Sequence, residues 1–347
     1  DFLNPTDEVR PGFPLVVRPS GRNENLSPAG GNANSVNLNR LDLARWLVSE
    51  KNPLTPRVTA NHIWSRLFGE GLVRTVGDFG VRGDRPSHPE LLDWLAATFM
   101  EDGWSRKRLI RLIMLSAAYR QSSATRPELA DIDPQNKLLH RQNRFRVEGE
   151  IVRDLHLSAG GLLSGKIGGP SVFPPMPEDI AALSYANNFK WTTSTGEDRY
   201  RRGMYTFFKR TAPYPDLTAF DCPDANLTNV KRTLSDTPLQ ALTTLNAEAF
   251  AEAARALASR VLAENLANDD ERLTRAFRLC VSRAPAPREI TALRKLLYDS
   301  RAWYEKHPEE VLAAGGKADA RFAPGEHAAW SATVRVILNL DEFVTRE

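Results

Sequence analysis

Apolar residues recur every three or four positions over long parts of the chain, which is the pattern of amphipathic α-helices. In residues 55–68 this repeat puts five apolar side chains on one helical face: Ala60, Ile63, Trp64, Leu67 and Phe68. Thr55 can cap the start of this helix and Gly69 can end it. A second helix is predicted to start at Ser87, because Ser87 and Glu90 have the S-x-x-E spacing of a capping box.

Further amphipathic segments cover residues 105–120, 144–163, 235–262 and the C-terminal third of the chain. The first of these carries Arg and Lys on its outer face. In the third, Asp236 or Thr237 is the expected cap and Pro238 the expected first helical residue. The pattern therefore predicts a mainly α protein, a multi-helix globular bundle.

The helical pattern is interrupted once, in residues 166–235, where Gly, Pro and aromatic residues stand at close spacing. Short strands around residues 204–209 would give this insert at most a small β element. We expect one compact domain made of four stretches: an extended lead-in (1–40), an N-terminal helical half (41–165), the irregular insert (166–235) and a C-terminal helical half (236–347). Because the chain starts at Asp1 and not at Met, we expect it to be either a processed form or a fragment of a longer protein.

The charge balance argues against nucleic acid as a partner. The chain has 46 Lys and Arg against 43 Asp and Glu, a formal charge of +3, whereas nucleic-acid binders carry a concentrated positive excess. No apolar run reaches the ~20 residues that a transmembrane segment needs. The two cysteines, Cys222 and Cys280, fit either one disulfide or two free thiols.

Motifs of the common metal and cofactor sites are missing from the sequence. It has no HExxH, Walker, GxGxxG or GxSxG pattern. Four histidines have no second ligand at metal spacing, so we expect no metal site and no cofactor in this chain: His140, His156, His307 and His327. His88 precedes a predicted helix, whose positive end favours the neutral imidazole that proton transfer needs. The competing interpretation is that His88 holds the turn through a hydrogen bond.

The residues 197–224 combine Arg, Lys and aromatic side chains more densely than any other stretch. We expect the ligand-binding residues here: Arg199, Tyr200, Arg202, Tyr205, Lys209, Arg210 and Asp224. If the chain is an enzyme, Asp221 or His88 is the expected catalytic residue for proton transfer. Three interpretations of this stretch stay open: a pocket for a polar ligand, a set of ion pairs that holds the insert in place, and a nucleic-acid surface. The acidic residues at its end disfavour the last.

Several long motifs, in this order, resemble the domain of unknown function 1553 family, which is abundant in planctomycetes: LDLARWLVSEKNPLTPRVTANHIW, LIMLSAAYRQSS, NRFRVEGEIVRD, KIGGPSVFPP, TPLQALTTLN and NLDEFVTRE. The resemblance implies an exported, extracytoplasmic protein whose partners are N-terminal domains of the same full-length chain. It also implies that haem c can be present in a linked planctomycete-type cytochrome module outside this chain. It supplies no catalytic residues.

The sequence and the resemblance together favour recognition or processing of an extracytoplasmic glycan, or of another polar ligand, in an Arg- and aromatic-rich pocket. The alternative is a non-catalytic structural or interaction module that docks partner domains. Whether the chain is an enzyme stays open at this point.

Overall fold

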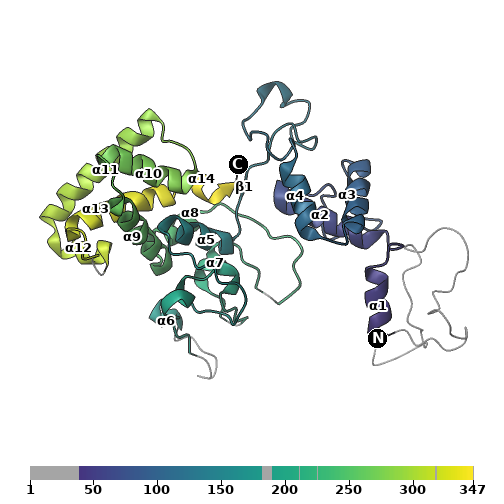
Figure 1. Ribbon diagram of the computed structural model, residues 1–347, viewed down its shortest axis with the longest axis horizontal. Helices are drawn as coiled ribbons and strands as arrows, with labels where there is room; N and C mark the ends of the chain where they lie inside the picture. Colours follow the sequence, from purple (N-terminus) through teal and green to yellow (C-terminus); the bar gives the residue numbers. More distant parts are fainter. Residues whose placement is uncertain (1–38, 182–189, 211, 225, 317–318, 347) are drawn as a thin grey trace, which may run out of the picture. The chain divides into compact units, whose positions relative to one another are not determined.

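The computed structural model describes residues 39–181, 190–210, 212–224, 226–316 and 319–346 (Figure 1). The chain divides into two compact units, an N-terminal unit (residues 1–143) and a C-terminal unit (residues 144–347). This division falls between residues 143 and 144, about 20 residues before the predicted end of the N-terminal helical half. The described residues form fourteen α-helices and one two-stranded sheet, which confirms the prediction of a mainly α protein.

The N-terminal unit is built from four helices: α1 (Arg40–Leu47), α2 (Leu54–Phe68), α3 (Pro89–Glu101) and α4 (Arg106–Leu115), followed by a 3-10 turn, η2 (Pro127–Leu129). Its core gathers the apolar face predicted for residues 55–68 with the inner faces of α3 and α4. Trp64 stacks on Phe68 with ring centroids 4.3 Å apart, and the edge of Tyr119 meets Phe68 at 5.6 Å. These contacts bury the aromatic side chains that the helical repeat had placed on one face.

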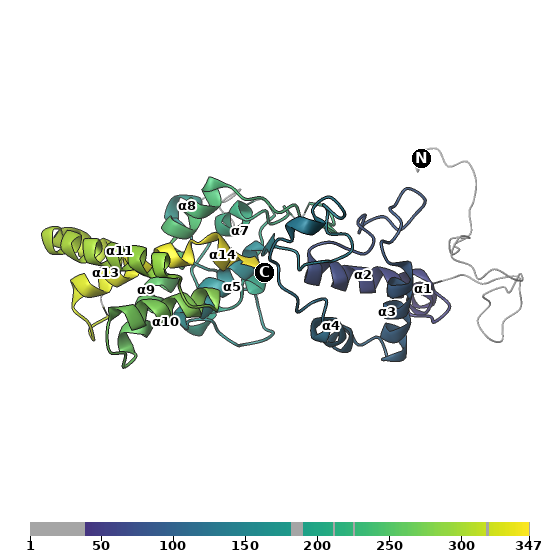
Figure 2. The same cartoon turned by 90° about the horizontal axis from the view of Figure 1, so that it is seen from above.

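The C-terminal unit contains the remaining elements: β1 (Phe145–Arg146), α5 (Gly149–Gly160), α6 (Glu178–Ala181), η4 (Gly196–Tyr200), η5 (Gly203–Tyr205), α7 (Pro215–Ala219), α8 (Pro238–Asn246), α9 (Glu248–Ala263), α10 (Asp269–Val281), α11 (Pro287–Lys306), α12 (Pro308–Gly315), α13 (Pro324–Leu338), α14 (Asp341–Val344) and β2 (Thr345–Arg346). Helices α9, α11 and α13 lie side by side in both views (Figures 1 and 2).

The core of the C-terminal unit is centred on α9 and α13. Trp330 is fully buried there and donates its indole N–H to Glu326 Oε1 at 2.9 Å. Helix α5 packs closely on α9 because Gly160 has no side chain: a Cβ at this position would lie 2.7 Å from the carbonyl oxygen of Ala253. The two helices thus approach to backbone contact, which only Gly permits here.

The single sheet lies elsewhere than predicted. Strands β1 and β2 pair antiparallel, with Phe145 opposite Arg346 and Arg146 opposite Thr345, so the first and last described segments of the C-terminal unit meet. Residues 204–209, predicted to hold strands, contain the 3-10 turn η5 and one isolated bridge between Val172 and Thr206. In this bridge Val172 donates to the Tyr205 carbonyl oxygen and accepts from the N–H of Phe207, both at 2.8 Å, so the described part of the insert has no strand of its own and stays within the small β element that the sequence allows at most.

Two predicted helix caps are also wrong. Helix α2 has Pro53 as its N-cap residue, and Asn52, one position earlier, accepts hydrogen bonds at its Oδ1 from the N–H groups of Leu54 (2.9 Å) and Thr55 (3.2 Å). At α3 the N-cap is His88, without a side-chain cap bond, and the predicted Ser87 box does not form. At α8, Thr237 is the N-cap residue and Pro238 the first helical residue, as predicted, although the Thr237 side chain makes no cap hydrogen bond. At α8 the Pro at the first helical position marked the boundary correctly.

Candidate functional site

Arg199, predicted to bind a ligand, is bound to helix α9 of its own unit. Its Nη2 donates to Glu252 Oε1 at 2.7 Å and to Glu248 Oε1 at 2.8 Å, and its Nε lies 3.1 Å from both Glu252 oxygens. The carbonyl oxygen of Arg199 accepts a further hydrogen bond from Arg153 Nη2 at 2.7 Å. These contacts fasten η4 to both α9 and α5.

Arg201, two residues further along the chain, is fully buried and binds a loop within the insert itself. It donates to the carbonyl oxygens of Gly168 and Pro170, the latter at 3.0 Å. Its guanidinium lies 3.8 Å from the centre of the Tyr205 ring, and the Tyr205 hydroxyl accepts the N–H of Gly168 at 2.7 Å. Both Arg201 and the predicted ligand-binding residue Tyr205 therefore hold the loop around Gly168 in place.

A third polar contact inside the insert joins Tyr214 to Asp216. The buried Tyr214 hydroxyl lies 2.8 Å from both Asp216 Oδ2 and the Pro175 carbonyl oxygen, and the ring stacks on Trp191 at 5.6 Å. Burial raises the pKa of Asp216 and holds the pKa of Tyr214 well above its ordinary value. Burial lowers the pKa of nearby Arg153, an effect opposed by the charges of these groups.

Asp221, the predicted proton-transfer residue, is a hydrogen-bond acceptor for a neighbouring loop. Its carboxylate accepts the backbone N–H of Ser235 at 2.7 Å, the Ser235 hydroxyl at 2.8 Å and Gln240 Nε2 at 3.4 Å. Asp221 has a positive φ of 59°, a conformation that Asp tolerates better than most residues. These contacts fix the start of the loop that leads to α8.

Cys222 lies beside a bidentate ion pair. Arg232 donates to the two oxygens of Glu150 at 2.6 and 2.9 Å, and Cys222 Sγ lies 4.0 Å from Glu150 Oε1. Cys222 and Cys280 are both free thiols, which decides between the two alternatives that the sequence left open. Burial raises the pKa of both thiols, that of Cys280 to about 12.

The remaining predicted residues of the insert differ in exposure and in their contacts. Tyr200 is half-buried and its carbonyl oxygen accepts the N–H of Ser164 at 3.0 Å. Arg202 and Arg210 are exposed, and Lys209 is half-buried. The exposed Asp224 accepts two hydrogen bonds from Asn226, at 2.8 and 3.0 Å. A ligand-binding role for these residues stays a prediction.

His88 lies in the N-terminal unit, whereas Asp221 lies in the C-terminal unit. His88 Nδ1 is 2.9 Å from the hydroxyl of Ser87, so the hydrogen bond that holds the turn is present. Its proposed role in proton transfer stays a prediction. Ser87, however, is part of the wall of a cleft that the sequence did not reveal.

This polar cleft, which we call the Asn136 cleft, has a volume of about 300 Å³. Its walls come from the end of α2, the loop before α3 and the loop 135–143, and consist of Trp64, Glu70, Gly71, Leu72, Arg74, Asp84, Arg85, Ser87, Gln135, Asn136, Lys137, Leu139 and Asn143. Three of these side chains are basic and two are acidic. Small-ligand sites are concave and contain a few convergent polar groups on a mainly apolar wall, and this cleft has the concave form with a more polar wall.

The three basic side chains of the cleft differ in their partners. Arg74 is occupied, because its Nε pairs with Glu70 at 2.8 Å and its Nη1 donates to Gln135 Oε1 at 2.7 Å. Arg85 and Lys137 are exposed and form no ion pair with any residue that the structure describes. Two cations at the cleft are thus available to an anionic group.

The loop that carries Lys137 is held rigidly by two buried side chains. Asp133 accepts the N–H groups of Lys137 and Leu138, both at 2.8 Å. Asn136 donates to the Arg141 carbonyl oxygen and to Asn143 Oδ1, both at 2.8 Å. Although burial acts to raise it, these backbone hydrogen bonds lower the pKa of Asp133. The loop therefore presents Lys137 without needing to be ordered by a ligand.

A family model described as "Protein of unknown function (DUF1553)" matches residues 39–297. The chain belongs to this family. Neither a curated protein nor a solved structure matches it. The residues of the Asn136 cleft and of the insert both lie within the matched range.

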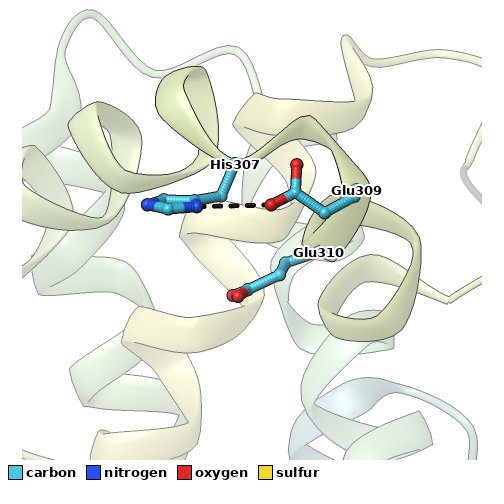
Figure 3. Close-up of side chains that lie close together, drawn as sticks. All are labelled: His307, Glu309 and Glu310. Atoms are coloured by element: carbon cyan, nitrogen blue, oxygen red, sulfur yellow. Dashed lines mark hydrogen bonds and ion pairs between the residues drawn. The ribbon is translucent and has the colours of Figure 1, made fainter.

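Beyond the matched residues, the described part of the chain brings together a group of potential metal ligands that the sequence analysis missed. His307, Glu309 and Glu310 offer ligand atoms within 4.8 Å of one another (Figure 3), so the prediction that His307 has no neighbouring ligand was wrong. Their contacts account for the arrangement without an ion: His307 stacks on Trp303 at 3.9 Å, and Trp303 Nε1 donates to Glu310 Oε2 at 2.9 Å. Both Glu residues lie in the first turn of α12, where the helix dipole favours negative charge.

In the part of the chain that the structure describes, no helix combines the length and the hydrophobicity that a membrane crossing requires.

Proposed function

We propose that this protein recognises an acidic polar ligand in the Asn136 cleft. The observation that carries the proposal is the pair Arg85 and Lys137, two exposed cations without an ion-pair partner among the described residues, on the wall of a rigid polar cleft. A carboxylate or sulfate group of the ligand would form the ion pair that Arg85 and Lys137 do not form with the described residues. Hydrogen bonds to charged groups are stronger than those between neutral groups, so this contact would supply specificity for an anion.

The ligand class we favour is an extracytoplasmic glycan that carries carboxylate or sulfate groups. The cleft offers side-chain amides from Gln135 and Asn143 and the Ser87 hydroxyl, which can bind sugar hydroxyls. Trp64 and Leu72 supply apolar wall, although both are almost fully buried. The two acids of the cleft, Glu70 and Asp84, disfavour a polyanionic nucleic-acid strand.

This proposal moves the expected ligand site from the insert to the N-terminal unit. The support for the move is that Arg199 and Arg201 of the insert already have partners within the C-terminal unit. For the insert itself we favour the structural alternative, in which its Arg and aromatic side chains hold α5, α9 and the Gly168 loop together. The exposed residues Arg202 and Arg210 remain available for a second contact.

The location that goes with this proposal is extracytoplasmic, in a longer protein whose N-terminal domains are its partners. A haem c module in that longer protein is the linked cofactor that we propose. Both rest on the resemblance to the family. Fractionation of cells that express the full-length protein, together with a haem stain, tests both.

The binding proposal is tested on a glycan array that pairs acidic glycans with neutral forms of the same backbone. We expect binding to acidic members only, and loss of that binding in an Arg85→Gln/Lys137→Gln variant. Arg82→Gln is the matched control, because Arg82 is an exposed cation three residues from Arg85 that does not line the cleft. Equal binding by wild type and the double variant would place the ligand outside the cleft. No binding to any acidic glycan would reject the ligand class.

A processing enzyme is distinguished from a recognition module by the fate of a bound glycan. Incubation of each array hit with the protein, followed by mass analysis, would show shortened or modified glycan only if the protein is catalytic. A His88→Ala variant then shows whether His88 contributes, since it contacts the cleft residue Ser87.

A further inference from the structure

A second concave surface of the N-terminal unit lies between α2 and α4 and has the opposite chemistry to the Asn136 cleft. This α2–α4 groove has a volume of about 320 Å³, at the lower end of the range of small-ligand pockets. Its apolar wall includes Val58, Ile63, Leu67 and Ile110. The groove is therefore apolar where the cleft is polar.

The helical repeat explains why this groove is continuous. On α4, Arg106, Ile110 and Met114 follow one another at four-residue spacing and so lie on one face. The first two line the groove, and Met114, which continues their row, is 41% exposed. On α2 the lining residues run from Val58 to Leu67, about 14 Å along the helix at 1.5 Å per residue.

The charged side chains that line the groove are cationic. Arg66 and Arg106 line it, and no Asp or Glu does. Arg106 forms no ion pair with any described residue, and α4 carries three more cations: Lys107, Arg108 and Arg111. Of these, Arg108 pairs with Asp102 at 3.2 Å. An apolar wall beside the positive charge of Arg106 is complementary to a molecule with an apolar chain and an anionic end.

We propose that the α2–α4 groove binds a free single-chain amphiphilic anion, such as a fatty acid or an alkyl sulfate. The alkyl chain lies along Ile63, Leu67 and Ile110, and the head group bonds to the guanidinium of Arg106. A docked protein helix fits less well, because a stable protein interface buries about 800 Å² on each partner and this groove is only about 14 Å long. The site is separate from the Asn136 cleft and does not depend on the function proposed for it.

The test is displacement of a dansyl-labelled fatty acid from the full chain, followed by fluorescence. We expect decanoate to displace the probe, and decyltrimethylammonium, which has the same alkyl chain with a cationic end, to be weaker by about tenfold or more. Equal displacement by both would show that the charge of the groove plays no part, and would overturn the proposal. Failure of the probe to bind would overturn it as well.

Variants locate the head group. Arg106→Gln is expected to weaken decanoate by about tenfold and to leave decyltrimethylammonium unchanged. Lys107→Gln is the matched control, an exposed neighbour that does not line the groove, and should leave both affinities unchanged. Ile110→Glu should weaken decanoate further by placing a negative charge on the wall. Wild-type affinity in Arg106→Gln would contradict the assignment.

A second measurement separates a free amphiphile from a membrane surface. Binding to vesicles of anionic phospholipid, with no binding of monomeric decanoate, would show that α4 contacts a bilayer and would reject the groove as a ligand site. The Arg85→Gln/Lys137→Gln variant should bind decanoate as the wild type does, since neither residue lines the groove. Failure of the glycan experiment therefore has no bearing on this one.

Discussion

Arg199 and Glu252 form a multiple hydrogen-bonded ion pair that joins the turn η4 to helix α9, with a shortest contact of 2.7 Å between Arg199 Nη2 and Glu252 Oε1. The two side chains stand 53 positions apart in the sequence and are each about one-fifth exposed. Because the insert has little regular backbone bonding of its own, this pair is one of the contacts that decide where it lies.

Arg199→Gln is expected to lower the free energy of unfolding by about 1–2 kcal/mol, since the half-buried Glu252 is left with a poorer partner. Urea unfolding followed by circular dichroism measures it. The control is Lys295→Gln, which breaks the exposed pair with Asp299 and should change stability by at most about 0.5 kcal/mol. Equal effects of the two variants would mean that the Arg199 pair contributes no more than a surface pair.

Arg201→Met is expected to be more damaging, by about 2–3 kcal/mol, because it removes a fully buried guanidinium together with its hydrogen bonds to the carbonyl oxygens of Gly168 and Pro170. The neighbouring Arg202 is exposed, so Arg202→Met should stay within about 0.5 kcal/mol of wild type. Thermal unfolding measures the stability of the two variants, and limited proteolysis measures how far the insert is loosened in each. Similar behaviour of the two variants would contradict the buried role of Arg201.

The sequence predicted the helices well because each carries its own signal. The face formed by Trp64 and Phe68 is visible in the spacing alone, and Pro238 marks the start of α8. The sheet was not predictable from the sequence. Its strands β1 and β2 have two residues each and lie about 200 positions apart, so neither shows an alternation of apolar and polar residues. Short local patterns cannot specify such a pairing.

The role of individual side chains was less predictable than the fold. The density of Arg and aromatic residues around Arg199 suggested a ligand site. Its partners Glu248 and Glu252 lie 49 and 53 positions away, so the local sequence does not show the ion pair. The Asn136 cleft was missed because its cations, Arg85 and Lys137, come from two separate loops. One signal was available in the sequence: the DPQNK turn, whose Asp and Asn side chains favour local backbone bonds.

His156 should make stability depend on pH in the acid range. The ring is buried between Phe250 and Phe343, and its Nε2 has no hydrogen-bond partner in the structure. Burial lowers the pKa of His156 from 6.5 to about 4. The unfolded chain therefore binds a proton between these values that the folded chain does not, so the free energy of unfolding falls as pH drops from 6.5 towards 4.

The size of this effect is about 3 kcal/mol at pH 4, since each unit of pKa shift corresponds to about 1.4 kcal/mol. Urea unfolding of wild type and of His156→Leu at a series of pH values measures it. The variant should lack the part of the slope between pH 6.5 and 4, whatever its stability at neutral pH. Parallel curves for the two proteins would show that His156 is not the responsible group.

The two thiols should react with alkylating reagents much more slowly in the native protein than in the unfolded one. Burial keeps Cys280 protonated at neutral pH, because it raises its pKa to about 12, and it acts in the same direction on Cys222. Mass spectrometry after iodoacetamide treatment at pH 8 should show slow modification of the native protein and two added groups after denaturation without reductant. Two added groups only after reduction would reveal a disulfide.

Asn136 allows the rigidity of the cleft to be tested without a ligand. The residue has a positive φ of 50° and its amide donates two hydrogen bonds, so it contributes through both conformation and bonding. Asn136→Gly keeps the conformation and loses the bonds, whereas Asn136→Ala loses both. We expect wild type to be the most stable and the Ala variant to be less stable than the Gly variant by about 1 kcal/mol. An Ala variant as stable as the Gly variant would show that the left-handed conformation is not required, and the loop would then present Lys137 less rigidly than its hydrogen bonds indicate.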